Sequence, residues 1–349
     1  MTAPRDPVAD LRRIAFLLER AHASTYRVRA FRGAAAALRA RDRAELEALA
    51  ASGELRRLRG VGDVTARCVV ESLAGDEPAY LRTLREPDGA AGADPGGTAL
   101  VDAALDLRAA LRGDCHSHTD ASDGGSPLAE MVETARELGH DYLVVTDHSP
   151  RLSVANGLSP DRLRTQVREI AELNLALADT GFRVLTGIEV DILDDGGLDQ
   201  EPDLLAELDV VVASVHSKLR MPAAEMTERM LTAVANPHVD VLGHCTGRMV
   251  TGSRTRPESQ FDADAVFGAC AANGVAVEIN SRPERLDPPK RLLRRAVAAG
   301  CLFAIDTDAH APGQLDWLDN GCSRAADCGV PAERVLNTWP VERLLGHTR

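Results

Sequence analysis

Imidazole and carboxylate side chains stand where most of the short apolar runs of this sequence end. They are His116 and His118, Asp147 and His148, Glu189, His216, His244, Glu278, and Asp308 with His310, and the amide of Asn280 follows Glu278. Six of the ten histidines of the chain lie at such ends. One histidine at the end of a strand is commonly just a hydrogen-bonded core residue, but six at equivalent positions are not explained in that way. Imidazole and carboxylate without thiolate form a ligand set that suits Zn, Mn or Fe.

The number of these side chains exceeds what one metal ion can use, because an ion takes roughly four to six ligands. We therefore expect two or three divalent metal ions. Adjacent divalent ions about 3.5–4 Å apart can bridge a hydroxide and stabilise charge on the attacking and leaving oxygens of a phosphoryl centre. The residue types thus predict metal-dependent hydrolysis of a phosphoester by a metal-bridged hydroxide.

The apolar runs that carry these side chains are too short for typical helices and are mostly rich in Val, Ile or Leu. They span residues 142–145, 183–188, 209–215, 239–243, 274–279 and 301–305, and a further segment ends at His116 and His118. Helical patterns lie between them, for example after Ser126-Pro127 and after Ser159-Pro160. Seven β-α repeats predict a parallel sheet that closes as a barrel, with the carboxyl ends of all strands at one mouth.

The first 87 residues have a different texture. Their apolar residues recur at helical spacing and they are rich in Ala, Leu, Glu and Arg, so we expect an all-helical domain over 1–87. Gly, Pro, Asp and Ala dominate residues 86–99, which predicts a linker over 88–112 before a barrel domain over 113–349. Residues 1–87 carry 16 arginines against 12 acidic residues, a balance of +4, so the remainder carries −17 of the total −13. The acidic remainder fits either solubility or a site for divalent cations.

A glycine turn within the helical domain could bind an anion. Gly60, Val61 and Gly62 lie between two helical segments, and a G-V-G turn before a helix presents backbone N–H groups to a phosphate. The alternative is a packing turn between two core helices. With the local positive balance, the turn predicts contact with the DNA backbone rather than with bases.

Several classes of protein are not expected. No apolar run approaches the roughly 20 residues of a membrane span, and the first residues lack the pattern of a secretion signal, so we expect a cytoplasmic protein. The cysteines are scattered and odd in number, so we expect no disulfide framework. Strand alternation points Cys115 and Cys245 away from the mouth, so we expect them in the core and not as nucleophiles. The residues carry no signal for an oligomeric state.

The phrases HSHTDASDG, VTDHSP, GIEVDIL, SVHSKL, VLGHCT, VEI and DTDAH resemble the PHP (polymerase and histidinol phosphatase) superfamily over about residues 113–349. The resemblance implies a distorted (β/α)7 TIM-like barrel, an α/β fold. It also implies nine metal ligands at His116, His118, Asp123, His148, Glu189, His216, His244, Asp308 and His310. Glu189 would be the bridging carboxylate, and we assign catalytic roles to Glu189, His216 and Asp308. Some relatives have His in place of Asp123. Asp147 is either a partner that holds an imidazole or a turn cap.

The segment LRRLRGVGDVTARCVVESL resembles a helix-hairpin-helix, and residues 7–87 resemble the amino-terminal domain of bacterial family-X DNA polymerases. In relatives with lyase activity a Schiff-base lysine follows the glycine turn, whereas this chain has Cys68 there and no lysine before Lys218. We therefore expect no deoxyribose-phosphate lyase activity. A polymerase palm would have to lie between the two domains, where only linker residues are found, so we expect no polymerase activity.

Together these features predict a phosphoesterase that acts at DNA ends, as a 3'-5' exonuclease or 3'-end processing enzyme of DNA repair. Lys218, Arg248 and Arg282 lie near the mouth in sequence and are candidates to bind substrate phosphate. One alternative is a phosphatase of a small phosphomonoester of the histidinol phosphate or nucleotide type, because the same metal centre serves both substrates. Another is a non-catalytic module that binds DNA ends.

Overall fold

The computed structural model describes residues 4–85, 102–252 and 255–348. The chain forms two compact units, Met1–Gly97 and Thr98–Arg349, and each is described here by itself. Among the described residues no helix is both long and apolar enough to cross a membrane.

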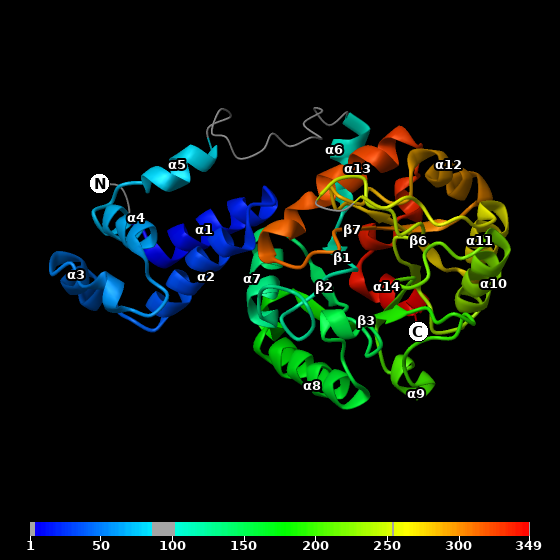
Figure 1. The fold of residues 1–349 in the computed structure, drawn as a ribbon, viewed down its shortest axis with the longest axis horizontal. Helices are drawn as coiled ribbons and strands as arrows, with labels where there is room; N and C mark the ends of the chain where they lie inside the picture. The colour runs from blue at the N-terminus through cyan, green and yellow to red at the C-terminus, as the bar shows by residue number, and fades with distance from the viewer. Residues whose placement is uncertain (1–3, 86–101, 253–254, 349) are drawn as a thin grey trace. The chain divides into compact units, whose positions relative to one another are not determined.

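The described part of the first unit is helical, as the sequence predicts (Figure 1). Its helices are α1 (Pro7–Arg20), α2 (Thr25–Arg39), α3 (Arg43–Ala51), the short 3-10 helix η1 (Leu55–Arg57), α4 (Asp63–Leu73) and α5 (Ala79–Arg85). Asp6 caps α1 and Asp42 caps α3, each accepting a hydrogen bond from a backbone N–H of the first turn. Apolar residues of α1, α2 and α4 meet in one core.

The glycine turn of this unit joins η1 to α4. Gly60 has φ +94°, and a Cβ atom there would lie 3.1 Å from the carbonyl oxygen of Gly33 in α2, so both the conformation and the close packing require glycine. Gly62 differs, because its φ is −103° and no atom lies within 4 Å of the position of a Cβ. The turn therefore tolerates a side chain at Gly62 but not at Gly60.

The second unit contains seven parallel strands in the order β1 to β7, which form a nearly closed barrel as predicted. The strands are β1 (Gly113–Asp114), β2 (Tyr142–Val145), β3 (Arg183–Asp191), β4 (Val210–Ser214), β5 (Val241–Leu242), β6 (Ala276–Asn280) and β7 (Leu302–Asp306). Strands β2 to β7 overlap the apolar runs of the sequence, and β1 lies just before His116 and His118. The gap between β1 and β7 is bridged by Asn337, whose amide donates to the carbonyl oxygens of Gly113 and Ile305 at 3.0 and 2.6 Å.

Helices cover the outside of the barrel. They are α6 (Asp102–Ala110), α7 (Leu128–Glu137), α8 (Pro160–Ala176), α9 (Pro202–Leu205), α10 (Ala223–Val234), α11 (Ala263–Asn273), α12 (Lys290–Ala299), α13 (Leu318–Asp327) and α14 (Val341–Thr348). Short 3-10 helices lie at Ser153–Ala155, Ala178–Thr180, Pro312–Trp317, Ala332–Arg334 and Leu336–Thr338. Along one side of the barrel, α11 packs between α10 and α12 (Figure 1).

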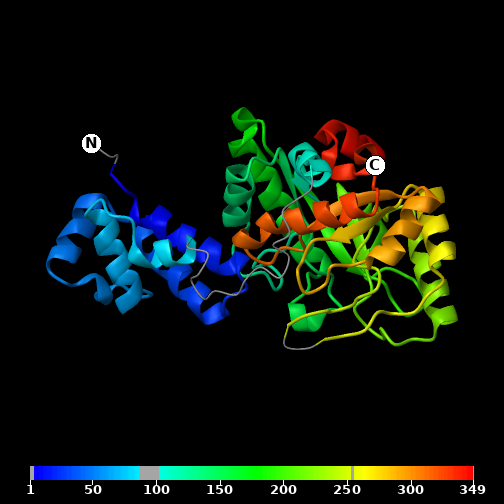
Figure 2. The same ribbon diagram turned by 90° about the horizontal axis from the view of Figure 1, so that it is seen from above.

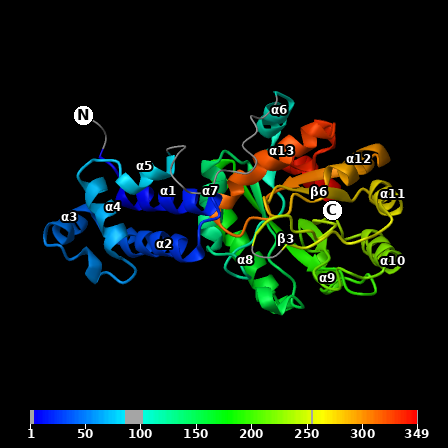
Figure 3. The ribbon, with the colours of Figure 1, turned by 45° about the horizontal axis from the view of Figure 1, so that its top comes forward.

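The predicted linker over 88–112 is wrong for residues 102–110, which form α6 and pack against α13 (Figure 3). Ala104 and Leu107 of α6 are buried, and this apolar pair one turn apart gives the helix a face to bury. The rest of that prediction, up to residue 101, lies outside the described residues.

The interior of the barrel changes from apolar to polar along the strands. Near the strand starts, inward side chains such as Val212 and Ala276 pack with Trp339 and Leu344 of the C-terminal segment. Figure 2 shows this red C-terminal segment and the yellow loop after β5 at opposite edges of the unit. Two residues after Ala276 the inward position is Glu278, so the polar layer lies at the carboxyl ends of the strands.

Candidate metal centre

Glu189 of β3 lies at the centre of the polar layer. Its Oε2 is 3.3 Å from Nε2 of His116, 3.6 Å from Nε2 of His118 and 2.9 Å from Nδ1 of His148. The side chains of Glu189, His116 and His118 have no exposed surface. The loop after β1 and the end of β2 thus bring three imidazoles to one carboxylate oxygen.

The other oxygen of Glu189 faces the far side of the barrel. Oε1 is 3.2 Å from Nε2 of His216, which follows β4, and 2.9 Å from Nε2 of His244, which follows β5. One carboxylate therefore has imidazoles on both of its oxygens. This arrangement fits the bridging role that the family resemblance implies for Glu189.

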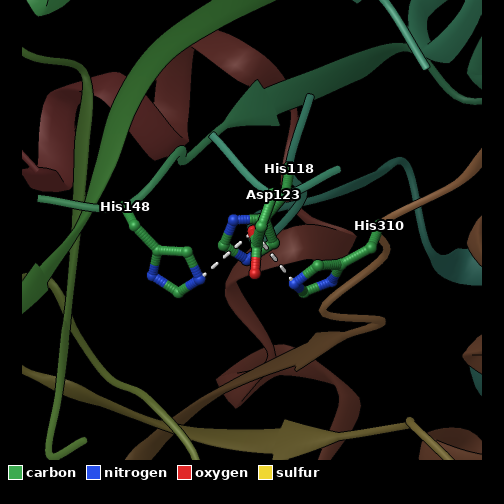
Figure 4. A group of neighbouring side chains, drawn as sticks. All are labelled: His118, Asp123, His148 and His310. Atoms are coloured by element: carbon green, nitrogen blue, oxygen red, sulfur yellow. Dashed lines mark ion pairs between the residues drawn. The ribbon is translucent and has the colours of Figure 1, made fainter. Parts of the chain in front are cut away.

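A second group of ligands surrounds Asp123, in the loop after β1. Figure 4 shows His118, Asp123, His148 and His310 converging on one region. Oδ1 of Asp123 is 3.5 Å from Nε2 of His148 and 3.4 Å from Nε2 of His310. Asp308, after β7, adds a carboxylate whose Oδ1 is 3.4 Å from Nε2 of His118.

Three overlapping groups of these residues could each hold an ion. In each, one ligand atom per residue lies within 4.8 Å of the others: His118, Asp123, His148 and His310; His116, His118 and Glu189; and His148, Glu189 and His216. Among the described residues, the buried Nε2 atoms of His116, His118 and His216 have no hydrogen-bond partner. Buried polar atoms normally have partners, so these nitrogens fit metal ligands. The nine predicted residues therefore lie together at one centre, and their role as metal ligands stays a prediction.

Neighbouring acceptors fix the orientation of three of the imidazoles. Glu278 Oε1 lies 2.6 Å from Nδ1 of His116, Asp191 Oδ1 lies 3.2 Å from Nδ1 of His216, and the carbonyl oxygen of Asp308 lies 2.8 Å from Nδ1 of His310. In a neutral imidazole whose Nδ1 donates to one of these oxygens, Nε2 carries no proton and faces the centre. These contacts therefore select the tautomer that can bind metal through Nε2.

The electrostatics of the centre keep its carboxylates charged. Burial opposes charge on Glu189, but His216 and His116 outweigh it and hold the pKa of Glu189 well below its usual range. Burial likewise opposes charge on Asp308, and Arg285 holds the pKa of Asp308 well below its usual range. Burial and the neighbouring His310 lower the pKa of His118. Charged carboxylates and a neutral imidazole are the protonation states that bind metal.

Asp147 organises the loop that carries Asp123. Its carboxylate accepts hydrogen bonds from the backbone N–H of Thr119 at 2.8 Å, from Oγ1 of Thr119 at 2.6 Å and from the Ser122 hydroxyl. Of the two alternatives at the sequence level, the turn cap describes these contacts better than a partner of an imidazole.

Arg282 and Arg285, in the loop after β6, both approach Asp308. Nη1 of Arg282 lies 3.7 Å from Asp308 Oδ1, and Nε of Arg285 lies 2.9 Å from Asp308 Oδ2. Nη1 of Arg285 is buried without a hydrogen-bond partner among the described residues. Arg285 was not among the predicted site residues, because nothing in its spacing separates it from other arginines.

The other two predicted phosphate-binding residues point elsewhere. Lys218 Nζ lies 2.6 Å from Asp194 Oδ2, and its side chain is mostly exposed. Arg248 donates to the carbonyl oxygens of Arg285, at 3.0 Å from Nε, and Leu286. The structure thus brings Arg282 to the metal ligands, while phosphate binding by Lys218 and Arg248 stays a prediction.

Cys115 and Cys245 lie in apolar core clusters, and burial raises the pKa of both thiols well above the usual range. Protonated buried thiols are poor nucleophiles. Both residues are therefore core residues, as the strand alternation predicts.

In the first unit, two amides of the glycine turn already have partners. The N–H of Val61 donates to the carbonyl oxygen of Leu58 at 3.0 Å, and the N–H of Gly62 donates to Oγ1 of Thr65 at 2.9 Å. The amides that begin α4, at Asp63 and Val64, donate to no described residue. DNA binding through Gly60, Val61 and Gly62 stays a prediction, and the first amides of α4 are the better placed donors.

Comparison with known proteins agrees with both units. A family model described as "PHP domain" matches residues 114–282, and one described as "Helix-hairpin-helix domain" matches residues 4–77. The "DNA polymerase/3'-5' exonuclease PolX" of Bacillus subtilis (strain 168) is 40% identical over 227 residues, which are 65% of this chain and 39% of that protein. The chain therefore corresponds to well under half of the length of this relative.

A "Probable phosphatase" of Caldanaerobacter subterraneus subsp. tengcongensis is 28% identical over 240 residues, 64% of this chain and 86% of that protein. A solved structure of histidinol phosphate phosphatase from Lactococcus lactis has a TM-score of 0.46 and 19% sequence identity, and the match covers 63% of this chain and 94% of that one. The matched regions are therefore a helix-hairpin-helix domain over residues 4–77 followed by a PHP domain over residues 114–282.

Proposed function

We propose that this protein hydrolyses phosphoester bonds at DNA ends, as a 3'-5' exonuclease or 3'-end processing enzyme. The observation that carries the proposal is the combination of two features in one chain. The barrel is 40% identical over the matched region to a protein named as a polymerase and 3'-5' exonuclease, and a helix-hairpin-helix domain precedes it. Helix-hairpin-helix units hold DNA through its phosphates, which suits an enzyme that must act on ends of any sequence.

The side chains of the centre have distinct roles in this proposal. Divalent Zn, Mn or Fe ions, two or three of them, would supply Lewis-acid stabilisation of the phosphoryl oxygens and activate water. Glu189, His216 and Asp308 would hold these ions in place next to the phosphoester that reacts. Glu278 and Asp191 keep the Nε2 atoms of His116 and His216 directed inward.

Arg282 and Arg285 place positive charge at the rim of the centre. Both lie against Asp308, and Arg282 has only 22% of its side chain exposed. Guanidinium groups bind phosphate oxygens through parallel hydrogen bonds, so the pair can hold the phosphoryl group and stabilise charge that develops on it.

A second candidate function is hydrolysis of a small phosphomonoester. It is favoured by the match to a relative named a probable phosphatase, of which this chain covers 86%. In that case the barrel alone would determine turnover and the helix-hairpin-helix domain would be a scaffold or regulator. A non-catalytic DNA-end-binding module is disfavoured because all nine predicted ligand positions are filled by ligand residue types.

A side-by-side turnover assay separates these functions. Full-length protein loaded with Mn or Zn is given 3'-recessed and nicked labelled DNA, histidinol phosphate and mononucleotides. Shortening of DNA, or release of its 3'-phosphate, at a kcat/KM well above that for the small esters supports the proposal. Release of phosphate only from the small esters identifies a phosphatase, and binding of DNA without any hydrolysis identifies a binding module.

A further inference from the structure

A pocket lined by arginine lies in the barrel unit beside the loop that follows β5. Its volume is about 310 Å³, and its lining includes Arg248, Arg256 and Arg291 together with Glu258. Arg291 pairs with Glu258 and keeps 61% of its side chain exposed. Three arginines and one glutamate thus line an open pocket.

This excess of positive charge stands out from its surroundings, because residues 88–349 carry a net charge of −17. The first turn of α12 adds to the contrast, since it carries Lys290 and Arg291 and no acidic residue. Lys290 pairs with Asp327 at 2.5 Å, so within this turn Arg291, which pairs with Glu258, is the side chain that lines the pocket. The pocket therefore has the charge of an anion-binding site.

The pocket adjoins the metal centre through one residue, Arg285. The side chain of Arg285 lies 2.9 Å from Asp308 at the centre, while its carbonyl oxygen accepts a hydrogen bond from Arg248 of the pocket at 3.0 Å. Nε of Arg256 donates to the carbonyl oxygen of Gly247. The pKa of Arg256 is lowered, mainly by burial and also by the charge of the neighbouring Arg285. Arg285 thus connects Asp308 at the centre to Arg248 of the pocket.

We propose that this pocket binds a backbone phosphate of a DNA strand whose terminal phosphoester lies at the metal centre. The inference rests on the proposed function and identifies the pocket as the site that determines substrate preference. A small phosphomonoester has a single phosphoryl group. When that group lies at the metal centre, the molecule has no second phosphate that could reach the pocket. A strand carries one phosphate per nucleotide, so a neighbouring phosphate can lie among the three arginines while the terminal one is at the centre. The pocket then favours polymers over mononucleotides.

The test compares two charge reversals on the same helix. Arg291→Glu alters the pocket, and Arg295→Glu is the matched control, because Arg295 is also exposed on α12 and also pairs with one carboxylate, that of Asp264. For each full-length protein, kcat/KM is measured with a single-stranded labelled oligonucleotide and with a mononucleotide, at two salt concentrations. The oligonucleotide kcat/KM divided by the mononucleotide kcat/KM should fall about five- to tenfold in Arg291→Glu, mainly because KM for the oligonucleotide rises. The same ratio should stay within twofold of the unaltered protein in Arg295→Glu. The salt dependence of the oligonucleotide value should also become weaker in Arg291→Glu.

If the ratio of the oligonucleotide kcat/KM to the mononucleotide kcat/KM is the same in both variants and in the unaltered protein, the pocket assignment is wrong. The proposed function still stands in that case, provided that the unaltered protein hydrolyses DNA. Hydrolysis of the mononucleotide alone by the unaltered protein would overturn both. Arg256→Gln provides an independent second variant, because it removes charge from the pocket without touching α12. It should lower the ratio in the same direction.

Discussion

The carboxylate of Glu278 lies 2.6 Å from Nδ1 of His116, and both side chains are completely buried. The second oxygen of Glu278 accepts a hydrogen bond from the backbone N–H of His244. A single carboxylate on β6 therefore positions a ligand after β1 and another after β5. With Nδ1 of His116 engaged, Nε2 is the atom that faces Glu189 and any bound metal.

Replacement of Glu278 by glutamine is expected to weaken metal binding. A glutamine has one acceptor oxygen, so it cannot serve both the ring of His116 and the backbone of His244, and a ligand loses its orientation. Affinity for Mn or Zn should fall roughly 10- to 100-fold, as for other residues that support metal ligands. Competition with a chelating dye measures this, with circular dichroism to confirm the fold. Unchanged affinity in a folded Glu278→Gln protein would show that Glu278 does not support the centre.

At the glycine turn, Gly62→Asp is expected to weaken DNA binding without unfolding the helical unit. Gly62 has room for a side chain and is the N-cap of α4, where aspartate and asparagine are both favoured. The added charge would repel a phosphate at the start of α4, so affinity for DNA should fall about five- to tenfold relative to Gly62→Asn. Fluorescence anisotropy with labelled DNA at several salt concentrations tests this. Equal affinities of the two variants would make the turn a packing feature.

Asp240, just before β5, gives the barrel a pH-dependent stability. Burial raises the pKa of Asp240 from 3.8 to about 8 although its carboxylate accepts a hydrogen bond from the N–H of Val211 at 2.8 Å. The folded state then holds this proton more tightly than the unfolded state does. The free energy of unfolding should therefore fall as pH rises from about 4 to 8, and level off above 8.

Asp240→Asn removes this effect, because asparagine stays neutral and its oxygen can still accept from Val211. The variant should gain stability over the unaltered protein between pH 5 and pH 8, by at most about 4 kcal/mol. Both tryptophans, Trp317 and Trp339, lie in the barrel unit, so denaturation followed by tryptophan fluorescence reports on that unit. A difference between the two proteins that does not change with pH would contradict the shifted pKa.

The positions of the strands and the convergence of the candidate ligands could be predicted because both depend on local features of the sequence. Strands β2 to β7 overlap short apolar runs, and candidate ligands such as Glu189 and His216 lie where such runs end. The side chains that support them are harder to predict. Glu278 and Asp191 are visible as polar residues at strand ends, but their contacts with His116 and His216 depend on which strands adjoin in the barrel.

Arginines in loops resist prediction for a different reason. A guanidinium group on a long flexible stem reaches several partners, and sequence spacing does not say which one. Arg248 reaches the carbonyl oxygens of Arg285 and Leu286, whereas Arg285 reaches Asp308. The linker predicted over 88–112 was wrong at α6 for a simpler reason. That helix follows a Gly- and Pro-rich stretch, and its short apolar face is buried only because it packs against α13.

The most direct test of the account is the loss of DNA hydrolysis in His118→Ala. His118 contributes to two of the three ligand groups, so its removal should lower the rate of 3'-end hydrolysis by orders of magnitude with the fold retained. His238→Ala, which alters a histidine outside the centre, is the matched control and should keep the rate. The measurement is turnover of 3'-recessed labelled DNA by Mn-loaded protein. A His118→Ala protein that hydrolyses this DNA at a near-normal rate, with normal metal content, would contradict the assignment of the active site.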